Sequence, residues 1–150
     1  MFVCYTEIYK ENLYDLLADK KIRRGGHGVY QPVTNIFQAL NYLKSGEKKR
    51  RKASTGLNAQ TSRSHTVFEI LLTNSLGRVE KSSFKFVELA GSENLSESTS
   101  SNFKEVISCI HKDLLSLGRV LMKLGSNKNQ HVPYRDSQLT YMLKGKEKLK

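Results

Sequence analysis

The chain has 150 residues, of which 38% are hydrophobic and 26% are charged, as in a single globular domain. No stretch approaches the roughly 20 apolar residues of a membrane-spanning helix, and no charged-then-apolar leader opens the chain, so we expect neither a membrane partner nor secretion. The 25 Lys and Arg residues exceed the 14 Asp and Glu residues by 11, which favours an acidic partner, either nucleic acid or an acidic protein surface.

The basic residues gather in three places along the chain. They lie at residues 20–24, in the KKRRK run at residues 48–52, and in a Lys-rich tail at residues 144–150. Such runs are either solvated loops or contacts with an acidic partner, and charge alone does not separate these two interpretations.

The first 50 residues predict one strand and two helices. Residues 2–9 are β-branched and aromatic and indicate a buried strand. Residues 11–17 indicate a short helix, and the basic, Gly-rich residues 18–30 indicate a loop. A second helix is expected after Asn35, which can cap it, and Gly46 is expected to end it. Its expected apolar stripe consists of Ile36, Phe37, Leu40 and Leu43.

The remaining residues predict two strands and two helices after a long loop. The loop covers the polar, basic residues 45–63, and a loop of that length is usually functional or disordered. Strands are expected at 64–73 and 78–89, joined by a hairpin turn. The strongest helical pattern covers 103–124, where apolar residues recur every three or four positions. A last helix is expected from about Tyr134 to Leu143.

The common catalytic and metal-binding motifs do not occur in these 150 residues. There is no phosphate-binding G-x-x-x-x-G-K-[ST] loop, no G-x-S-x-G nucleophile elbow, and no H-E-x-x-H or C-x-x-C pair. The four His residues are not spaced as a ligand set. We therefore expect neither a hydrolase triad nor a zinc site.

Two loop segments could carry chemistry. The segment NAQTSRSH at residues 58–65 places hydroxyls and an Arg just before a strand, where they could ligate Mg²⁺, contact phosphate or pair with a carboxylate. Taken alone, the segment fits a Ser-rich loop that bonds its own backbone better. The segment ELAG at residues 88–91 places an acidic residue at the end of a strand, with a Gly whose N–H can approach a γ-phosphate. It could equally be a plain turn.

Taken together and in order, four segments resemble the kinesin motor domain. YTEIYKENLYDLL is similar to the family pattern S-Y-x-E-I-Y-N-E-x-x-x-D-L-L, and NAQTSRSH is similar to the first switch, N-x-x-S-S-R-S-H. VELAGSE is similar to the second switch, D-L-A-G-S-E, and HVPYRDSQLT to H-I-P-Y-R-D-S-K-L-T at the microtubule face. The resemblance covers about residues 3–143, which we interpret as part of one motor domain, and leaves 144–150 as the basic tail.

The resemblance implies an ATP and Mg²⁺ switch at the two loop segments. It places Ser62 at the metal and lets Glu88 reach the metal through water. It makes Gly91 the sensor of the γ-phosphate, and pairs Arg63 with Glu93 when the switches close. The nucleotide contacts that it implies in the first segment are Asn58, Thr61, Ser62 and Ser64.

The resemblance also implies a microtubule as partner, and hence a place in the cytoplasm on the microtubule cytoskeleton. The helix at 103–124 would relay the nucleotide state to tubulin, whose acidic surface suits the net charge of +11. No groove-reading motif or aromatic stacking platform occurs, so nucleic acid is not expected. The implied tubulin contacts are Lys123, Lys128, His131, Tyr134 and Arg135.

The chain departs from the family pattern at several positions. Glu88 stands where the family has Asp, and the extra methylene displaces a carboxylate on which Mg²⁺ geometry depends. His111 and Asp113 stand where the relay helix has Asn and Ser, and Gln138 replaces a Lys. Because the phosphate loop supplies the N–H cradle, we do not expect these 150 residues alone to hold ATP tightly.

The expected fold is therefore α/β: a kinesin-type P-loop NTPase motor domain, truncated on its N-terminal side, with a central, mainly β sheet flanked by helices. Three functions are open. They are ATP hydrolysis coupled to movement along microtubules, a degenerate module that binds microtubules or a partner without hydrolysis, and, on charge alone, nucleic-acid binding. Because the phosphate-loop strand is central in the family's sheet, we expect the isolated chain to be poorly stable or to pair with the missing motor half or another kinesin chain.

Overall fold

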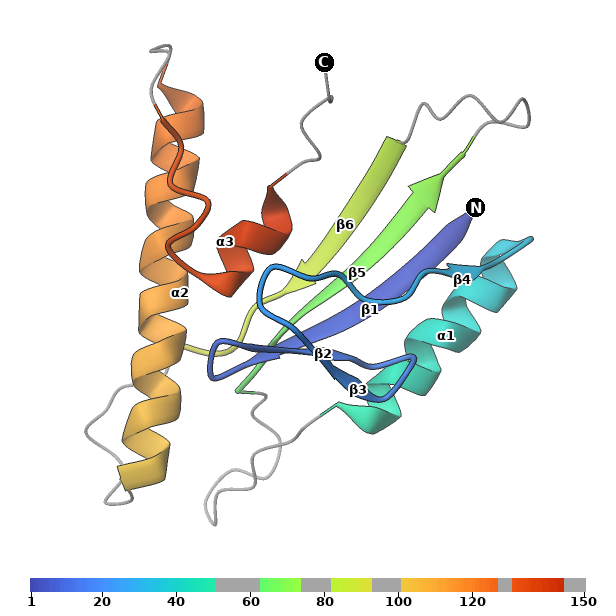
Figure 1. The fold of residues 1–150 in the computed structure, drawn as a ribbon, viewed down its shortest axis with the longest axis horizontal. Helices are drawn as coiled ribbons and strands as arrows, with labels where there is room; N and C mark the ends of the chain where they lie inside the picture. The colour runs from blue at the N-terminus through green and yellow to red at the C-terminus, as the bar shows by residue number, and fades with distance from the viewer. Residues whose placement is uncertain (51–62, 74–81, 93–100, 127–130, 145–150) are drawn as a thin grey trace.

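The computed structural model describes residues 1–50, 63–73, 82–92, 101–126 and 131–144, except for the side chains of residues 102 and 103. Its centre is a six-stranded sheet in the order β3-β2-β1-β5-β6, with β4 beside the first residues of β1 (Figure 1). All pairings are antiparallel. The strands are β1 (Phe2–Tyr9), β2 (Asn12–Asp15), β3 (Lys20–Ile22), β4 (Gln31–Pro32), β5 (His65–Leu72) and β6 (Ser82–Glu88).

Helices cover both faces of this sheet. α1 (Ile36–Lys49) lies on one face, and α2 (Ser101–Gly125) and α3 (Gln138–Leu143) lie on the other (Figure 1). Because side chains alternate along a strand, Tyr5 and Phe68 point toward α1, whereas Ile8 and Val67 pack against Leu139 of α3. The expected α/β fold, a mainly β sheet flanked by helices, is confirmed.

The helix expected at 11–17 is wrong, because the chain turns back there to form β2. Lys10 and Glu11 have φ angles of 48° and 58°, and form the two-residue connection between the paired residues Tyr9 and Asn12. Positive φ at both central residues is the geometry of a type I′ hairpin turn. The expected loop at 18–30 likewise contains a strand, β3, which extends the sheet beyond β2.

The start of α1 is confirmed, but its expected end is wrong. The Asn35 side chain accepts the N–H of Gln38, which satisfies one of the free amides at the helix start. The helix then passes through Gly46 to Lys49, because Gly46 is the point where α1 meets the sheet. A Cβ on Gly46 would lie 2.3 Å from Cδ1 of Tyr5.

The apolar stripe expected for α1 is also displaced. The helix buries Ala39 and Gly46, with Tyr42 and Leu43 partly covered. The expected stripe residues Ile36, Phe37 and Leu40 are exposed instead. The covered positions are three or four residues apart and therefore lie on one face of the helix. The two fully buried residues on this face, Ala39 and Gly46, are small, which lets the helix approach β1 closely.

The remaining elements follow the predictions with shifted ends. The strands expected at 64–73 and 78–89 are β5 and β6, and their expected connecting turn lies outside the described residues. The helix expected at 103–124 is α2, which buries Val106, Ile107 and Ile110. α3 begins later than expected: Ser137 caps it in a capping box with Thr140, and a turn occupies the residues before.

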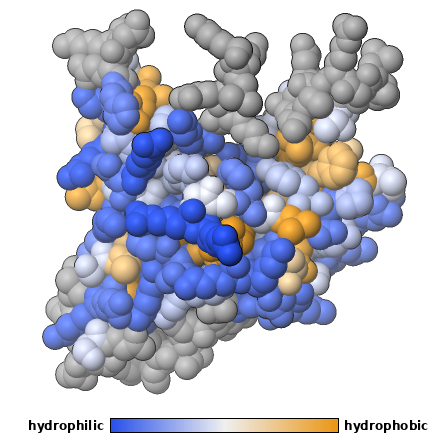
Figure 2. Space-filling view, viewed as in Figure 1, coloured by the Kyte–Doolittle hydropathy of each residue, from blue (hydrophilic) through white to orange (hydrophobic). Residues whose placement is uncertain are grey.

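Among the described residues, no helix is long and apolar enough to cross a bilayer. The face shown in Figure 2 is mainly hydrophilic, with apolar side chains reaching the surface in separate places.

Candidate functional site

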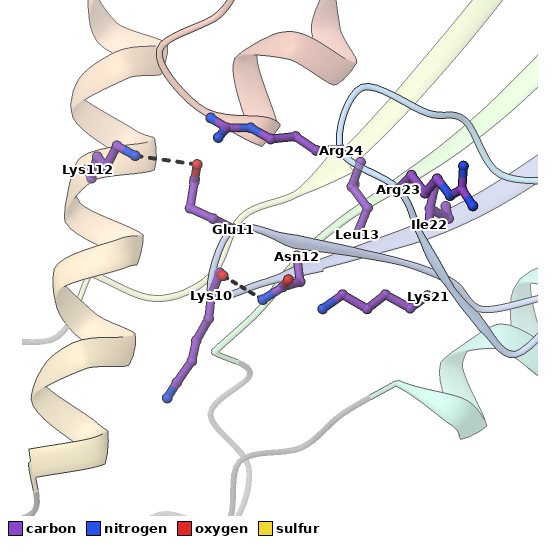
Figure 3. Close-up of a pocket in the computed structure, with 9 residues that line it drawn as sticks. All are labelled: Lys10, Glu11, Asn12, Leu13, Lys21, Ile22, Arg23, Arg24 and Lys112. Atoms are coloured by element: carbon purple, nitrogen blue, oxygen red, sulfur yellow. Dashed lines mark hydrogen bonds and ion pairs between the residues drawn. The ribbon is translucent and has the colours of Figure 1, made fainter.

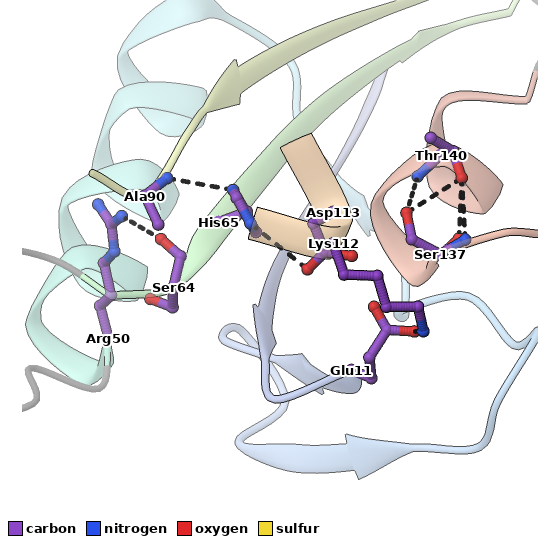
Figure 4. A network of polar contacts seen from close by, with 9 residues as sticks. All are labelled: Glu11, Arg50, Ser64, His65, Ala90, Lys112, Asp113, Ser137 and Thr140. Atoms are coloured by element: carbon purple, nitrogen blue, oxygen red, sulfur yellow. Dashed lines mark hydrogen bonds and ion pairs between the residues drawn. The ribbon is translucent and has the colours of Figure 1, made fainter. Parts of the chain in front are cut away.

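The described end of the first predicted switch segment, residues 63–65, lies beside the second segment, residues 88–91. β5 and β6 are neighbours in the sheet, with Thr66 opposite Glu88. Just beyond this pair, the backbone N–H of Ala90 donates to Nδ1 of His65 over 3.1 Å (Figure 4). The start of β5 and the end of β6 are thus joined at the same end of the sheet.

Arg50 joins the same two segments from the end of α1. One guanidinium nitrogen lies 2.6 Å from Oε2 of Glu88, and the other donates to the carbonyl of Ser64 over 3.0 Å. The Arg50 side chain is only 4% exposed, so its charge depends on these partners. Glu88 is therefore held by a cation from α1.

Sequence reasoning missed Arg50, because the basic run at residues 48–52 was interpreted either as a solvated loop or as a contact with an acidic partner. Neither interpretation predicted that Arg50 is buried within the fold, 7% exposed. A signal was present: Arg50 follows Gly46 by four positions and therefore continues the buried face of α1.

The residues at the start of β5 are fully enclosed. The Ser64 hydroxyl donates to Oε1 of Glu7 over 2.7 Å, and both residues are 0% exposed. Arg63 is buried as well, at 6% exposed. The hydroxyl of Ser64 thus ties β5 to β1, and its predicted contact with nucleotide stays a prediction.

Several predicted site residues lie outside the described part of the chain: Asn58, Thr61, Ser62, Glu93 and Lys128. The predicted Arg63–Glu93 pair and the Ser62 metal contact therefore stay predictions. Gly91 is described and is half-buried at the end of the β6 segment. Among the described residues, no group of three or more His, Cys, Asp or Glu side chains could hold a metal by itself.

The fit of Mg²⁺ can be tested at Glu88, the one predicted metal residue that is described. Its side chain is 57% exposed, which leaves room for a water-mediated contact, but Oε2 already pairs with Arg50. The residue therefore fits an outer, water-mediated role, in which one carboxylate oxygen is shared with a cation and the other is available to water.

A second polar cluster connects this site to α2 (Figure 4). Nε2 of His65 lies 3.5 Å from Oδ2 of Asp113, and both residues are buried. Burial, and then a hydrogen bond to Asp113, raise the pKa of the Glu11 carboxyl to about 7. Burial opposes the ionised form of Asp113, but hydrogen bonds with His65 and Glu11 outweigh it and lower the pKa of Asp113. Sequence reasoning noted Asp113 only as a departure from a family pattern, because its partners lie far away in the chain.

The predicted track-facing residues are mostly exposed and lie around the far end of α2 and the start of α3. Lys123, His131 and Arg135 are exposed, and Tyr134 is half-buried. Arg135 lines a cavity of about 390 Å³ together with Arg24, from the loop after β3. The basic stretch at 20–24 thus meets the start of α3, which the sequence did not predict.

A larger hollow lies between the β2–β3 hairpin and α2 (Figure 3). Its volume is about 550 Å³, and one carboxylate, Glu11, lies among its cations. Those cations are Lys10, Lys21, Arg23, Arg24 and Lys112.

Comparisons with known proteins agree on one family. The family model described as the kinesin motor domain matches residues 1–147. Kinesin-like protein 3 of Schizosaccharomyces pombe is 40% identical over 157 residues, covering 95% of this chain and 28% of that protein. The chloroplastic kinesin-like protein KIN-7E of Oryza sativa is 37% identical, covering 94% of this chain and 14% of that protein.

Solved structures give the same result. A KIF14 segment with ADP in complex with a microtubule superposes with a TM-score of 0.74 at 30% identity, covering 95% of this chain and 48% of that one. A fast kinesin superposes with a TM-score of 0.69 at 32% identity, covering 44% of that chain. The chain thus spans about half the length of these solved structures, and less than a third of the curated relatives named above.

Proposed function

This chain belongs to the kinesin motor-domain family, and on that premise we propose that it forms the nucleotide-switch and microtubule-facing part of an ATP-driven motor. The observation that carries this proposal is the junction of the two switch segments. Arg50 contacts Glu88 and the Ser64 carbonyl, and His65 accepts the N–H of Ala90. A change in one segment is therefore transmitted directly to the other.

ATP and Mg²⁺ are the proposed ligands of this junction, and when bound they supply the phosphoryl group and the cation that neutralises its charge. The residues of this chain have the supporting roles. Gly91 presents a backbone N–H without a side chain in the way, and Glu88 orients a metal-bound water. Arg63, beside the buried Ser64, is the proposed partner of Glu93 in the closed state.

Tubulin is the proposed partner of the surface around the far end of α2 and the start of α3. The KIF14 segment was solved in complex with a microtubule, and the proposed contact residues Lys123, His131 and Arg135 are exposed in this chain. The net charge of +11 favours an acidic partner, as tubulin is. This proposal places the protein on the microtubule cytoskeleton in the cytoplasm.

A second candidate function is binding to microtubules or to another motor chain without hydrolysis. The specific observation in its favour is at Glu88, where the family has Asp. The longer side chain is engaged by Arg50 at 2.6 Å, and a carboxylate fixed by a cation is a weaker partner for metal-bound water.

ATP turnover measured with and without microtubules separates the two candidates. The sample is the longest natural polypeptide that contains this chain, and Gly91→Ala is the matched variant. Turnover that microtubules stimulate, and that Gly91→Ala abolishes, supports the motor. Co-sedimentation with microtubules without any turnover supports the binding module instead. If a folded protein shows neither ATP turnover nor co-sedimentation with microtubules, both proposals are contradicted.

A further inference from the structure

A cavity of about 390 Å³ lies between the loop after β3 and the start of α3. Arg24, which extends from that loop toward α3 in Figure 3, lines one side of it, and Arg135 lines the other. No acidic residue is among the described residues that line it, whereas the larger hollow beside it has Glu11 among its cations. The lining of this cavity therefore presents two positive charges and does not neutralise them.

These two guanidinium groups also have no acidic partner elsewhere in the described part of the chain. The ion pairs among the described residues include neither Arg24 nor Arg135. Asp136, the acid next to Arg135 in the sequence, lies instead near Arg119, with Oδ2 3.8 Å from its guanidinium. Both arginines of the cavity are exposed and are therefore accessible to an anion.

The backbone holds Arg24 in place. Arg24 and Gly25 are the central residues of a turn in which the N–H of Gly26 donates to the Arg23 carbonyl over 2.8 Å. Gly25 has a φ of 76°, the positive angle that the third residue of a type II turn requires. The hydroxyl of Tyr141 in α3 donates to the Gly25 carbonyl over 3.4 Å and so ties the turn to α3. Little loop ordering is then needed when Arg24 binds a ligand.

The other side of the cavity is fixed in the same way. Arg135 lies in a turn in which the N–H of Asp136 donates to the Pro133 carbonyl over 3.4 Å, and Ser137 caps α3 directly after it. Gln138 adds a buried amide to the lining. It is 4% exposed, and its Oε1 has no hydrogen-bond partner among the described residues. Because a side-chain amide carries two N–H donors as well as its oxygen, Gln138 can donate to a ligand in the cavity.

We propose that this cavity binds the phosphate group of a phosphate monoester, carried either by a small molecule or by a phosphorylated side chain. Such a group has close to two negative charges at neutral pH and three oxygens that accept hydrogen bonds. Two guanidinium groups and one amide match this charge and these acceptors, whereas a carboxylate has one charge and two oxygens. The side chains of Arg24, Arg135 and Gln138 form the site, and the backbone N–H groups of the short helix α3 are not part of it. The site goes beyond the proposed function and does not rest on it.

Calorimetric titration with methyl phosphate tests the site. The sample is the longest natural polypeptide that contains this chain, with saturating ADP and Mg²⁺ so that any nucleotide site is already occupied. We expect Arg24→Gln and Arg135→Gln each to weaken binding by about ten-fold, because each removes a charge-assisted contact. Arg23→Gln is the matched control, since Arg23 belongs to the same turn but lines the larger hollow and not this cavity, and it should change the affinity by less than about two-fold. Equal losses in all three variants would show diffuse charge and overturn the site.

Probes with a single charge test the assignment to a monoester. Dimethyl phosphate keeps the tetrahedral shape with one charge, and acetate is a carboxylate. We expect both to bind about ten-fold more weakly than methyl phosphate at neutral pH and constant ionic strength. Acetate that binds as tightly as methyl phosphate would overturn the assignment to phosphate and would favour a carboxylate of an acidic protein instead.

Gln138→Leu tests the buried amide. The substitution should weaken the binding of methyl phosphate several-fold, while the melting temperature stays the same or rises, because a buried amide without a partner does not stabilise the fold. Unchanged affinity for methyl phosphate would contradict the match between three donors and three oxygens.

A bound ester should also affect the contact with the track. Arg135 is a proposed tubulin contact, so a phosphate group in the cavity would compete with tubulin, and this consequence alone rests on the proposed function. Methyl phosphate should lower the microtubule co-sedimentation of the wild type more than that of Arg24→Gln at matched ionic strength. A protein that binds methyl phosphate but not microtubules would contradict the proposed function and still support the site.

A peptide probe distinguishes the two sources of the phosphate group. It is a phosphoserine flanked by one alanine on each side, acetylated and amidated at its ends. Tighter binding of this peptide than of methyl phosphate would assign the site to a phosphorylated side chain, and equal or weaker binding would assign it to a small phosphate ester. If neither probe binds the folded wild-type protein, the proposal is wrong.

Discussion

At the scale of single residues, small side chains decide how α1 meets the sheet. Gly46 lies against the ring of Tyr5, and a Cβ there would approach Cδ1 to 2.3 Å and Cε1 to 2.8 Å. The Tyr5 ring is itself fixed, since it stacks edge-on against Phe68 with centroids 5.4 Å apart, and its hydroxyl bonds Glu47. The ring has little freedom to move away.

We therefore expect Gly46→Ala to destabilise the fold by about 1–3 kcal/mol, the usual cost of overpacking, although alanine favours helices. The control is Gly118→Ala in α2, where a Cβ would meet nothing within 4 Å. That substitution should stabilise the chain by up to about 1 kcal/mol. Chemical denaturation of both variants measures the difference, and equal effects would contradict the contact with Tyr5.

Single residues also differ in whether the sequence alone could predict their roles in the fold. The β-branched and aromatic run at residues 2–9, the Asn35 cap and the apolar period of α2 are local signals, and each led to a confirmed element. The turn at Lys10–Glu11 gave no such signal, because neither residue is a Gly or Asn. The partners of Arg50 and Asp113 lie up to tens of residues away, so their burial depends on tertiary packing that no local pattern encodes.

At the scale of elements, the start of α3 and the β3 loop form one basic surface. Arg24 and Arg135 line a common cavity, and the Tyr141 hydroxyl of α3 donates to the Gly25 carbonyl over 3.4 Å. Arg23 lines the hollow beside the β2–β3 hairpin, and Arg24 lines both that hollow and the cavity at Arg135. Arg24 therefore lies between the two cavities.

Arg135→Ala is expected to weaken microtubule co-sedimentation more than Arg23→Ala does, by roughly five-fold in affinity. The reason is position, because Arg135 and Arg24 present two guanidinium groups to one place, where a tubulin carboxylate could pair with both. Binding isotherms at two salt concentrations make the comparison. Equal losses for Arg135→Ala and Arg23→Ala would show that binding depends on diffuse charge rather than on this surface.

At the scale of the whole molecule, β6 is an edge strand of the sheet that carries exposed aromatic side chains. It pairs with β5 on one side, and no strand that the structure describes pairs with it on the other. Phe84 and Phe86 are 56% and 60% exposed, although they lie opposite Ile70 and Phe68, which belong to the core beneath α1. The apolar face of the sheet therefore continues beyond the area that α1 covers.

An open edge beside exposed aromatic rings is a template for pairing with another chain. We expect the isolated 150-residue chain to self-associate or to melt without cooperativity, and Phe84→Thr/Phe86→Thr to reduce the association without removing the edge. Leu115→Thr on α2, at a side chain that is 58% exposed, is the matched control for hydrophobicity alone. Sedimentation velocity measures the association. A wild-type chain that is monomeric and melts cooperatively would show instead that β6 needs no further strand.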